Sequence, residues 1–496
     1  MNFSKLRLNP KLKNMLHSKD INKICELKNG FASSWLEPEF ILSSLKSFSF
    51  SNLCNSISPV KVRGYSFQYI FAILVSLPFI GASSVNSMVN GFVKYQVESG
   101  KDTFYRLKNN PGICWRLILW LFAAKFKKLT ETGCSNSKHV RCMVFDDTVV
   151  AKTGKLIEKV SRVWDHVSNG WRVGFKLLLM GYWDGVSFIP LDFSFHRERG
   201  RNKEKPFGLK KKELRKQYKK QRKAGSYNHE RAAEADMSKI DSAIKMFKRA
   251  IAQGFKVDYV LMDSWFTCDA FIDAVLSVKR QAVHLIGMYK IAKTKFLYSE
   301  GAYTYSQIRN ILGKAHRCRK LGFYYNEAIV AHRGKELKLF FSKQGKNGKW
   351  KVFVCTDTKL TFIKMIEIYQ IRWSVEVFFK ESKQLLGLGK CQSNDFDAQI
   401  ADATITMVAH ILLTCRFRYE NYESKTGMFA QIKEETTMQR LDQRLWALFL
   451  EIVRVITTIF EETDEVQLME KIMRDEHVYK KISRLFGDNE KTKSAA

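Results

Sequence analysis

The sequence predicts an α/β protein, and two kinds of segment lead to this fold class. Short apolar runs at 141–145 and 257–262 suit strands buried on both faces, and each is followed by aspartate. Longer segments with apolar residues at helical spacing occur at 229–253, 364–390 and 397–419. At 496 residues, the chain has room for about two to four domains and a large core.

An alternation of strands and helices follows the first aspartates. Strands are expected at 174–182 and 186–195, joined in a hairpin by a Trp-Asp-Gly turn. A helix comes next, then the strand before Asp263, a helix near 268–277 and a strand at 281–287. The predicted order is therefore three strands, helix, strand, helix, strand, helix.

The helix expected at 364–390 carries an unusual polar face. It contains no proline, and we expect one continuous helix that ends at Gly387 and Gly389. At about 100° per residue, its most conspicuous polar side chains fall within roughly 60° of one another. These are Tyr369, Arg372, Glu376 and Lys383. A solvated face with ordinary ion pairs is the common alternative for such a pattern.

The spacing Tyr-x2-Arg-x3-Glu-x6-Lys on this helix resembles the signature of cut-and-paste transposases of the family named after insertion sequence four. The resemblance implies a ribonuclease-H-like catalytic core, which agrees with the predicted order of strands and helices. It also implies a β-rich insertion between a second catalytic Asp and the Glu, with helical N- and C-terminal regions. The implied reaction is metal-dependent excision and strand transfer of an insertion sequence.

The resemblance makes Glu376 the last member of an Asp-Asp-Glu catalytic triad, so two aspartates are expected upstream at strand ends. Asp263 matches the second position. Asp146 matches the first, because Thr148 stands two positions after it as in the family, although Asp147 is an alternative. Taken singly, each aspartate could instead be a helix cap or a turn residue.

The resemblance also implies how the site works. Two Mg²⁺ ions, for which Mn²⁺ can substitute, would activate the attacking oxygen and stabilise the leaving oxygen of an in-line displacement at phosphorus. Arg372 and Lys383 would bind phosphates beside the ions, and Tyr369 would contact the DNA backbone or a flipped nucleotide. The implied metal ligands are Asp146, Asp263 and Glu376.

The net charge indicates a polyanionic partner. Lys and Arg number 83 against 49 Asp and Glu, which gives a formal net charge of +34. Double-stranded DNA is expected, because dispersed cations gain affinity for phosphates by counterion release. A membrane is not expected, since the longest apolar runs, 69–80 and 117–126, are too short to span one. The ten cysteines form no CxxC pair, so neither a zinc site nor a disulfide framework is indicated.

A dense basic segment, 197–223, holds 14 of the Lys and Arg residues against 3 Glu. We expect a mobile arm or a solvated helix that contacts DNA, because like charges at this density repel one another. A plain solubilising face is the alternative. The candidate DNA-binding residues in this segment are Lys210, Lys211, Lys212, Arg215, Lys219 and Lys220.

Alternating segments between 291 and 356 predict a small β-rich module, in agreement with the insertion that the resemblance implies. In relatives that cleave through a DNA hairpin, a Trp of this module stacks on a flipped base. Trp350 is the candidate for this contact with DNA, and packing in the core or at an edge is its alternative.

These expectations divide the chain into four parts. Residues 1–130 form a helical domain that binds the transposon ends, and 131–290 with 357–425 form the catalytic domain. Residues 291–356 form the insertion, and 426–496 form a helical region that serves dimerisation or core packing. Because no signal peptide is recognisable, we expect the protein in the bacterial cytoplasm, associated with the nucleoid.

Two other functions fit part of the pattern. One is a ribonuclease-H-like DNA nuclease that does not transfer strands, and the other is a DNA-binding protein that has lost catalysis. The polar face of the 364–390 helix favours a transposase over a simple nuclease. Carboxylates at all three expected places speak against the inactive protein.

Overall fold

The computed structural model describes residues 39–57, 64–82, 84–90, 99–131, 139–290, 293–436 and 474–478. The helical region expected at 426–496 falls outside the described residues, apart from 426–436 and 474–478.

Helices dominate the described residues before 132. Their bounds are α3 Glu39–Ser47, α4 Phe50–Ile57, α5 Phe67–Ser76, α6 Val85–Asn90, α7 Lys101–Lys108 and α8 Trp115–Glu131. α5 begins after Ser66, whose hydroxyl accepts a hydrogen bond from the backbone N–H of Tyr69. These helices agree with the helical structure expected for the N-terminal part of the chain, and α8 packs against β4 of the sheet.

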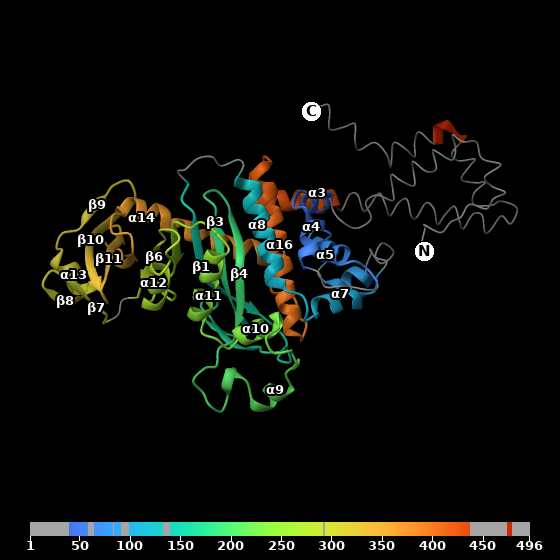
Figure 1. Cartoon of the computed structure of the whole chain (residues 1–496), viewed down its shortest axis with the longest axis horizontal. Helices are drawn as coiled ribbons and strands as arrows, with labels where there is room; N and C mark the ends of the chain where they lie inside the picture. The colour runs from blue at the N-terminus through green and yellow to red at the C-terminus, as the bar shows by residue number, and fades with distance from the viewer. Residues whose placement is uncertain are drawn as a thin grey trace.

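A mixed sheet forms the centre of the molecule (Figure 1). Its first strands are β1 Cys142–Ala151, β2 Ser161–Asp165, β3 Gly170–Trp183, β4 Phe188–His196, β5 Tyr259–Met262 and β6 His284–Tyr289. β3 pairs antiparallel with β1 on one side and β4 on the other, while β5 is parallel to both β1 and β6. The resulting order β4-β3-β1-β5-β6 is consistent with a ribonuclease-H-like nuclease. The predicted hairpin is confirmed as β3 and β4, and β2 was not expected.

The basic segment and the helices after it join β4 to β5, and one further helix joins β5 to β6. They comprise the 3-10 turn η2 Pro206–Gly208, α9 Lys211–Lys216, α10 Tyr227–Glu234, α11 Lys239–Ala252 and α12 Asp269–Leu276. The single helix expected at 229–253 is therefore two helices, and α11 starts after Ser238. α11 packs against β3 and β4, and α12 packs against β6.

The segment between β6 and the polar-faced helix extends the same sheet. It contains β7 Lys295–Tyr298, β8 Gly301–Thr304, α13 Tyr305–Ile311, β9 His316–Cys318, β10 Phe323–His332, β11 Lys335–Gln344 and β12 Lys351–Cys355. β12 pairs antiparallel with β6, so these strands lie beyond β6, at the left of Figure 1 and opposite the N-terminal helices. The prediction of mostly β-structure here agrees with these strands.

The prediction of one continuous helix over 364–390 is wrong. The segment forms α14 Phe362–Tyr369, the 3-10 turn η3 Gln370–Arg372 and α15 Trp373–Gln384. The tighter turn lies where the chain contacts both β1 and β5, and it divides the polar face between two helices. Gly387 and Gly389, with φ of 78° and 91°, reverse the chain after α15 has already ended.

The next helix, α16 Phe396–Tyr419, is largely buried. Of the helices in the described ranges, it is the one long and apolar enough to cross a membrane by length and composition. However, 89% of its most apolar window is buried inside the protein, where α16 contacts α8, α5 and β4. Core packing therefore explains its apolar character.

Candidate active site

Asp146 and Asp263 lie side by side at the same level of two parallel strands. The last pair in the ladder between β1 and β5 is Phe145 with Met262, and each aspartate directly follows its member of that pair. Neighbouring strands are about 4.8 Å apart. Two carboxylates separated by 117 positions in the sequence are thereby brought together, as the sequence predicted.

Asp147 faces the other side of the sheet. Successive side chains of a strand alternate between faces, and the carboxylate of Asp147 forms ion pairs with Lys239 of α11 and, at 3.6 Å, with Lys176 of β3. Asp146 instead faces η3 and α15. The geometry therefore favours Asp146 over Asp147 as the first carboxylate of the site.

Asp263 also shapes the turn that follows β5. Its Oδ1 accepts hydrogen bonds from the backbone N–H groups of Trp265, at 2.9 Å, and Phe266, at 3.2 Å. Thr267 donates its hydroxyl to the backbone carbonyl of Asp263 at 2.7 Å. The turn role considered for a single aspartate is thus real here, and it holds the carboxylate in a fixed position beside Asp146.

Arg372 links the first and last carboxylates. Its Nη1 donates to Oδ2 of Asp146 at 3.0 Å, and its Nη2 donates to Oε1 of Glu376 at 2.6 Å. Arg372 and Glu376 are four residues apart, so they lie one turn from each other on the same helical face. The planar guanidinium can serve two carboxylates at once because it presents separate donors in a fixed fork.

Burial dominates the electrostatics of Asp146. Removal of this carboxylate from water raises its pKa to about 7, and the neighbouring carboxylate of Asp263 acts in the same direction. Arg372 opposes the rise. The pKa of Arg372 is itself raised, because its carboxylate partners and Tyr369 outweigh the effect of burial. A second cation near Asp146 would favour its ionised form.

Tyr369 positions the helix rather than facing open solvent. Its hydroxyl donates to the backbone carbonyl of Met262, the residue before Asp263, at 3.2 Å. Its ring packs edge-to-face on Phe353 of β12 with centroids 4.9 Å apart. The hydroxyl of Tyr369 is therefore already hydrogen-bonded to β5. Its expected contact with DNA stays a prediction.

Lys383 lies further along α15, on the same side of the sheet as Asp146. Its Nζ donates to Oγ1 of Thr148 at 2.6 Å, and Thr148 shares a face of β1 with Asp146. Burial lowers the pKa of Lys383. The four residues of the predicted polar face thus remain near one another despite the break at η3, with two of them bound to β1 and one to β5.

The carboxylates of the predicted triad suit a hard divalent cation by their chemistry, but their present arrangement suits one only in part. Carboxylate oxygens are the ligands that Mg²⁺ prefers, and the half-buried carboxylates of Asp146 and Asp263 repel each other without a cation. Within the residues that the structure describes, however, no three His, Cys, Asp or Glu side chains lie close enough to hold one ion in the present arrangement. Arg372 lies between Asp146 and Glu376. A three-carboxylate metal site stays a prediction.

The basic segment is more ordered than the sequence suggests. Leu209 is buried, and Gln217 donates its side-chain amide to the carbonyl of Val160 at 2.8 Å. Figure 1 shows α9 below the central strands, held away from the N-terminal helices. The solvated helix, one of the two forms expected for this segment, agrees with α9, which has no buried residue. Hydrogen bonds to the backbone carbonyls of Leu156 and Val160 fix the backbone that follows α9.

Lys220 is not among the exposed cations of this arm. Its Nζ lies 2.8 Å from carboxylate oxygens of both Asp395 and Asp397 and donates to the carbonyl of Asn109 at 2.5 Å. Arg222 pairs with Glu158 in the same cluster. The prediction that Lys220 binds DNA is therefore corrected, because Asp395 and Asp397 neutralise its charge within the protein. The remaining candidates are exposed, namely Lys210, Lys211, Lys212, Arg215 and Lys219.

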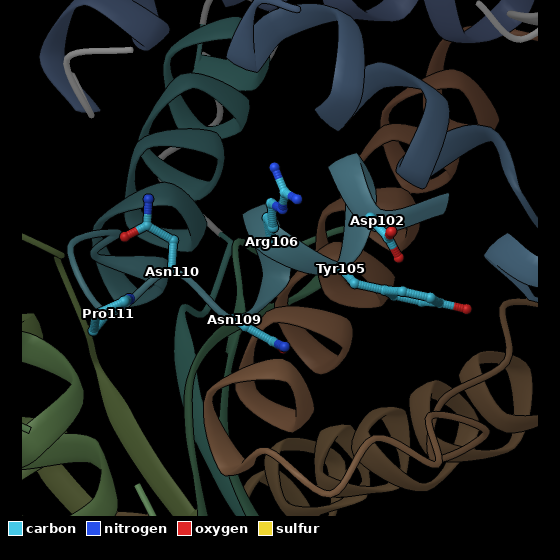
Figure 2. Close-up of a pocket in the computed structure, with 6 residues that line it drawn as sticks. All are labelled: Asp102, Tyr105, Arg106, Asn109, Asn110 and Pro111. Carbon is cyan, nitrogen blue, oxygen red and sulfur yellow. The ribbon is translucent and has the colours of Figure 1, made fainter. Parts of the chain in front are cut away.

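A depression in the surface adjoins this anchored end of the arm (Figure 2). Lys220 and Asn228 hold the turn beside it, since they donate to the backbone carbonyls of Asn109 at 2.5 Å and Asn110 at 3.3 Å. The depression is lined by side chains of α7 and the turn after it, namely Asp102, Tyr105, Arg106, Asn109, Asn110 and Pro111. The depression is wide and open, and none of the three predicted catalytic carboxylates lines it.

Trp350 occupies an edge position. It precedes β12, is half-buried, and lies 5.2 Å from each of the cations of Arg309 and Lys343, measured to the ring centre. This arrangement agrees with edge packing, the alternative considered for it. Contact with a flipped base stays a prediction.

Sequence reasoning missed two exposed tryptophans beside the site. Trp265, two positions after Asp263, is 41% exposed and holds Nζ of Lys239 3.8 Å from its ring centre. Trp373 directly follows Arg372 and is 63% exposed. Their closeness in sequence to predicted site residues could have identified both tryptophans.

Comparisons with known protein families agree with this geometry. Residues 192–412 match the model of a transposase DDE domain, and residues 77–297 match that of a DDE superfamily endonuclease. The first range contains Asp263 and Glu376, and the second contains Asp146 and Asp263. Curated proteins provide no match to the chain. The two family matches support a DDE-superfamily transposase, an enzyme of the class that cleaves nucleic acid and generally uses divalent metal ions.

Proposed function

We propose that the protein is a DNA transposase that excises and reinserts an insertion sequence by a cut-and-paste route. One observation carries this proposal. Three acidic residues from distant segments converge, two by the register of β1 and β5 and the third through the bridge that Arg372 makes between Asp146 and Glu376. The polar face that includes this arginine also favours membership of the family named after insertion sequence four.

In this proposal Asp146, Asp263 and Glu376 hold divalent cations. Bound Mg²⁺ ions supply charge stabilisation at phosphorus and an activated oxygen nucleophile. Asp146 and Asp263 are fixed by the sheet and by the turn after β5. Glu376 would become the third ligand if its carboxylate released Arg372 and bound the cation instead.

The remaining side chains bind and orient DNA. Arg372, once released from a carboxylate, offers two donors to a phosphate beside the reacting group. Lys383 stands about 10 Å beyond Glu376 along the axis of α15, where it adds a second cation for the DNA backbone. Tyr369 keeps η3 against β5 through its hydrogen bond to Met262, so its role is to position the site.

The exposed cations of the basic arm supply general affinity for duplex DNA. They project from a backbone that Gln217 and Arg222 fix to the catalytic part, so binding does not first require the arm to become ordered. We further propose that residues 1–130 recognise the transposon ends, that the protein acts as a homodimer at two paired ends, and that it works in the bacterial cytoplasm at the nucleoid.

The test is to incubate the purified protein with Mg²⁺ and DNA that carries the inverted repeats flanking its coding sequence. Released ends and products joined to a second DNA are expected. Cleavage without joining would instead favour a ribonuclease-H-like nuclease, and binding without cleavage would favour an inactive DNA-binding protein.

A paired variant tests the site itself. Glu376→Gln should abolish cleavage and leave DNA affinity nearly unchanged, because it removes a metal ligand and little surface charge. Glu367→Gln is the matched control, since Glu367 is an exposed carboxylate of α14 that pairs only with Lys320 and Lys364 among the described ion pairs. Normal cleavage by Glu376→Gln would overturn the assignment.

A further inference from the structure

The three predicted metal ligands differ in which of their carboxylate oxygens are already hydrogen-bonded. Both oxygens of Asp146 accept hydrogen bonds, Oδ1 from the backbone N–H of Asp147 at 2.8 Å and Oδ2 from Arg372 at 3.0 Å. Oε1 of Glu376 accepts from Arg372 at 2.6 Å. Oδ2 of Asp263 and Oε2 of Glu376 accept no hydrogen bond from the residues that the structure describes. Arg372 therefore occupies one oxygen on each of two carboxylates that would share a cation.

A divalent cation and the guanidinium of Arg372 exclude each other at this place. Their charges have the same sign, so they repel each other at short range. The guanidinium also cannot give up its charge, because arginine stays protonated in proteins. The side chain of Arg372 therefore has to move before Asp146, Asp263 and Glu376 can close on an ion. This requirement agrees with the lack of a three-ligand cluster among the described residues.

The backbone at Arg372 is fixed while its side chain can turn. Arg372 is the last residue of η3 and directly precedes α15. Its guanidinium carbon lies 5.9 Å from the ring centre of Tyr369, and the hydroxyl of Tyr369 is bound to the carbonyl of Met262. Rotation about the side-chain bonds of Arg372 can thus release the carboxylates, while Tyr369 keeps η3 attached to β5.

The bridge is most open to solvent at Glu376. The side chain of Glu376 is 34% exposed, against 17% for Asp146 and 16% for Arg372. The next residue, Trp373, is 63% exposed, so this end of η3 lies at the surface. A partly exposed ion pair contributes little stability, so a stronger anion can replace Glu376 as the partner. A DNA phosphate is such an anion, because its oxygens match the donors of a guanidinium.

A single side chain would link the binding of DNA to the binding of cations. Among the ion pairs of the described residues, Arg372 is the sole cation paired with a carboxylate of the predicted triad. Lys383 also lies on α15, but its Nζ donates to the hydroxyl of Thr148 at 2.6 Å. Lys239 pairs with Asp147 on the other face of the sheet. Neither lysine therefore blocks the three carboxylates.

We propose that Arg372 is a latch that keeps divalent cations from the three carboxylates until a DNA phosphate binds its guanidinium. This proposal rests on the proposed function and adds an order to it, in which DNA binds before the cations. Because coupling between two binding sites is reciprocal, the cations tighten the DNA complex by the same factor. The protein without DNA holds an incomplete metal centre, so cleavage is restricted to DNA already bound at the site.

Calorimetric titration of the full-length protein with Mn²⁺, alone and bound to DNA, tests the latch. The DNA is a duplex that ends at the terminal repeat, so that no flank remains to be cut, and a titration of this duplex alone is subtracted. DNA should raise the affinity of the wild type for Mn²⁺ about tenfold or more. Equal affinities with and without DNA would overturn the proposal, and this comparison needs no variant.

Arg372→Met separates the latch from a direct contact between the cation and DNA. Without DNA, this variant should bind Mn²⁺ about tenfold more tightly than the wild type, because both bridged carboxylates are free. Lys383→Met is the matched control. It removes the same charge from the same helix, but Lys383 is bound to a hydroxyl and not to a carboxylate, so Mn²⁺ affinity should stay near that of the wild type. An affinity of Arg372→Met no higher than that of Lys383→Met would refute the latch.

Variants of the predicted ligands distinguish a failed latch from a failed metal site. With DNA bound, Asp146→Asn and Glu376→Gln should each weaken Mn²⁺ binding at least about tenfold. If they do so while DNA leaves the affinity of the wild type unchanged, the latch is wrong and the proposed function stands. If neither variant weakens Mn²⁺ binding, the metal site of the proposed function is wrong, and the latch fails with it.

Discussion

Arg372 carries two ion pairs whose geometry depends on the identity of the residue. Its two terminal nitrogens point to Asp146 and Glu376 at 3.0 Å and 2.6 Å. A lysine has one compact ammonium on a flexible chain and cannot hold the same two carboxylates at once. The charge of the site and its geometry can therefore be separated by a single substitution.

Arg372→Lys should lower the rate of DNA cleavage about tenfold or more, because hydrogen bonds to charged groups contribute about 1.5–3 kcal/mol each. The salt dependence of DNA binding should stay the same, since the net charge is kept. Single-turnover cleavage and binding at several salt concentrations measure the two effects. Arg319→Lys, at an exposed position, is the control; equal rates for both variants would mean that the bridge is not needed.

His196 predicts an acid-sensitive step in stability. Its Nδ1–H donates to the carbonyl of Met237 at 3.2 Å, and its Nε2 accepts the hydroxyl proton of Ser194 at 2.7 Å, so the ring is bound in its neutral form. Burial lowers the pKa of His196 from an ordinary value near 6.5 to about 4. The unfolded chain therefore takes up this proton first as the pH falls.

The stabilisation linked to His196 should be complete above pH ~6.5 and be lost as the pH falls toward ~4, by at most about 3 kcal/mol. Urea unfolding of the wild type and His196→Gln across this range measures it. The difference between the two proteins should shrink steadily with acid. A constant difference over the whole range would show that the histidine is not kept neutral by the fold.

The sequence could indicate the site residues because their types and spacings are chemically specific, yet it could not orient them. Asp146 and Asp147 are adjacent in the chain, and only the pleat of β1, packed between α11 and α15, sends one to Arg372 and the other to Lys239. Similarly, Lys220 looks like its neighbours in sequence. Its burial depends on carboxylates at 395 and 397, which no local pattern reveals.

At the scale of secondary structure elements, the basic arm shows how tertiary contacts override local charge repulsion. Fourteen cations in 27 residues would not fold alone, and they stay ordered because Arg222 and Lys220 enter a cluster with Glu158, Asp395 and Asp397. The broken helix at η3 has the same kind of cause. Tyr369 is bound to β5 and Arg372 to β1, so the chain tightens between the two attachments.

The arm separates cations that bind DNA from cations that hold the fold. Replacement of Lys210, Lys211 and Lys212 by Ala should reduce the slope of log K against log salt by up to about 0.9 for each DNA phosphate that is no longer neutralised, without loss of stability. Lys220→Ala should instead lower thermal stability and leave the slope nearly unchanged. Fluorescence anisotropy at several salt concentrations and thermal unfolding distinguish them. A reversed pattern would refute the division.

At the scale of the whole molecule, a buried ion network joins the N-terminal helices to the sheet. Arg116 of α8 pairs with Asp192 of β4 at 3.0 Å and with Glu234 of α10 at 2.6 Å. Arg249 of α11 also pairs with Asp192, at 2.7 Å. The region expected to bind transposon ends is thus attached to the predicted catalytic part through two buried carboxylates, Asp192 and Glu234, which are 1% and 7% exposed.

Asp192→Asn should cost about 3–5 kcal/mol of stability, because it leaves buried guanidinium groups without their partner. Denaturant unfolding measures the loss of stability. Asp184→Asn is the milder comparison, because Asp184 is a partly buried carboxylate that pairs only with Arg418 among the described ion pairs. A loss below that of Asp184→Asn would mean that the network does not hold the two regions together.

The order of strands and helices along the chain could be foreseen from the sequence, because buried strands and amphipathic helices have distinct periods. The long sheet that continues from β6 through β12 to β8 could not, since pairing between distant strands leaves no local signal. Strand β2 was missed for a related reason. It is five residues long, and its pairing with β3 is what makes it a strand.

The central claim is that Asp146, Asp263 and Glu376 share one metal centre, and titration of the protein with Mn²⁺ by calorimetry tests it most directly. Asp146→Asn, Asp263→Asn and Glu376→Gln should each weaken binding at least about tenfold, while Asp147→Asn, whose carboxylate faces Lys239, should bind as the wild type. Unchanged Mn²⁺ affinity in the three variants, or a loss confined to Asp147→Asn, would contradict the account.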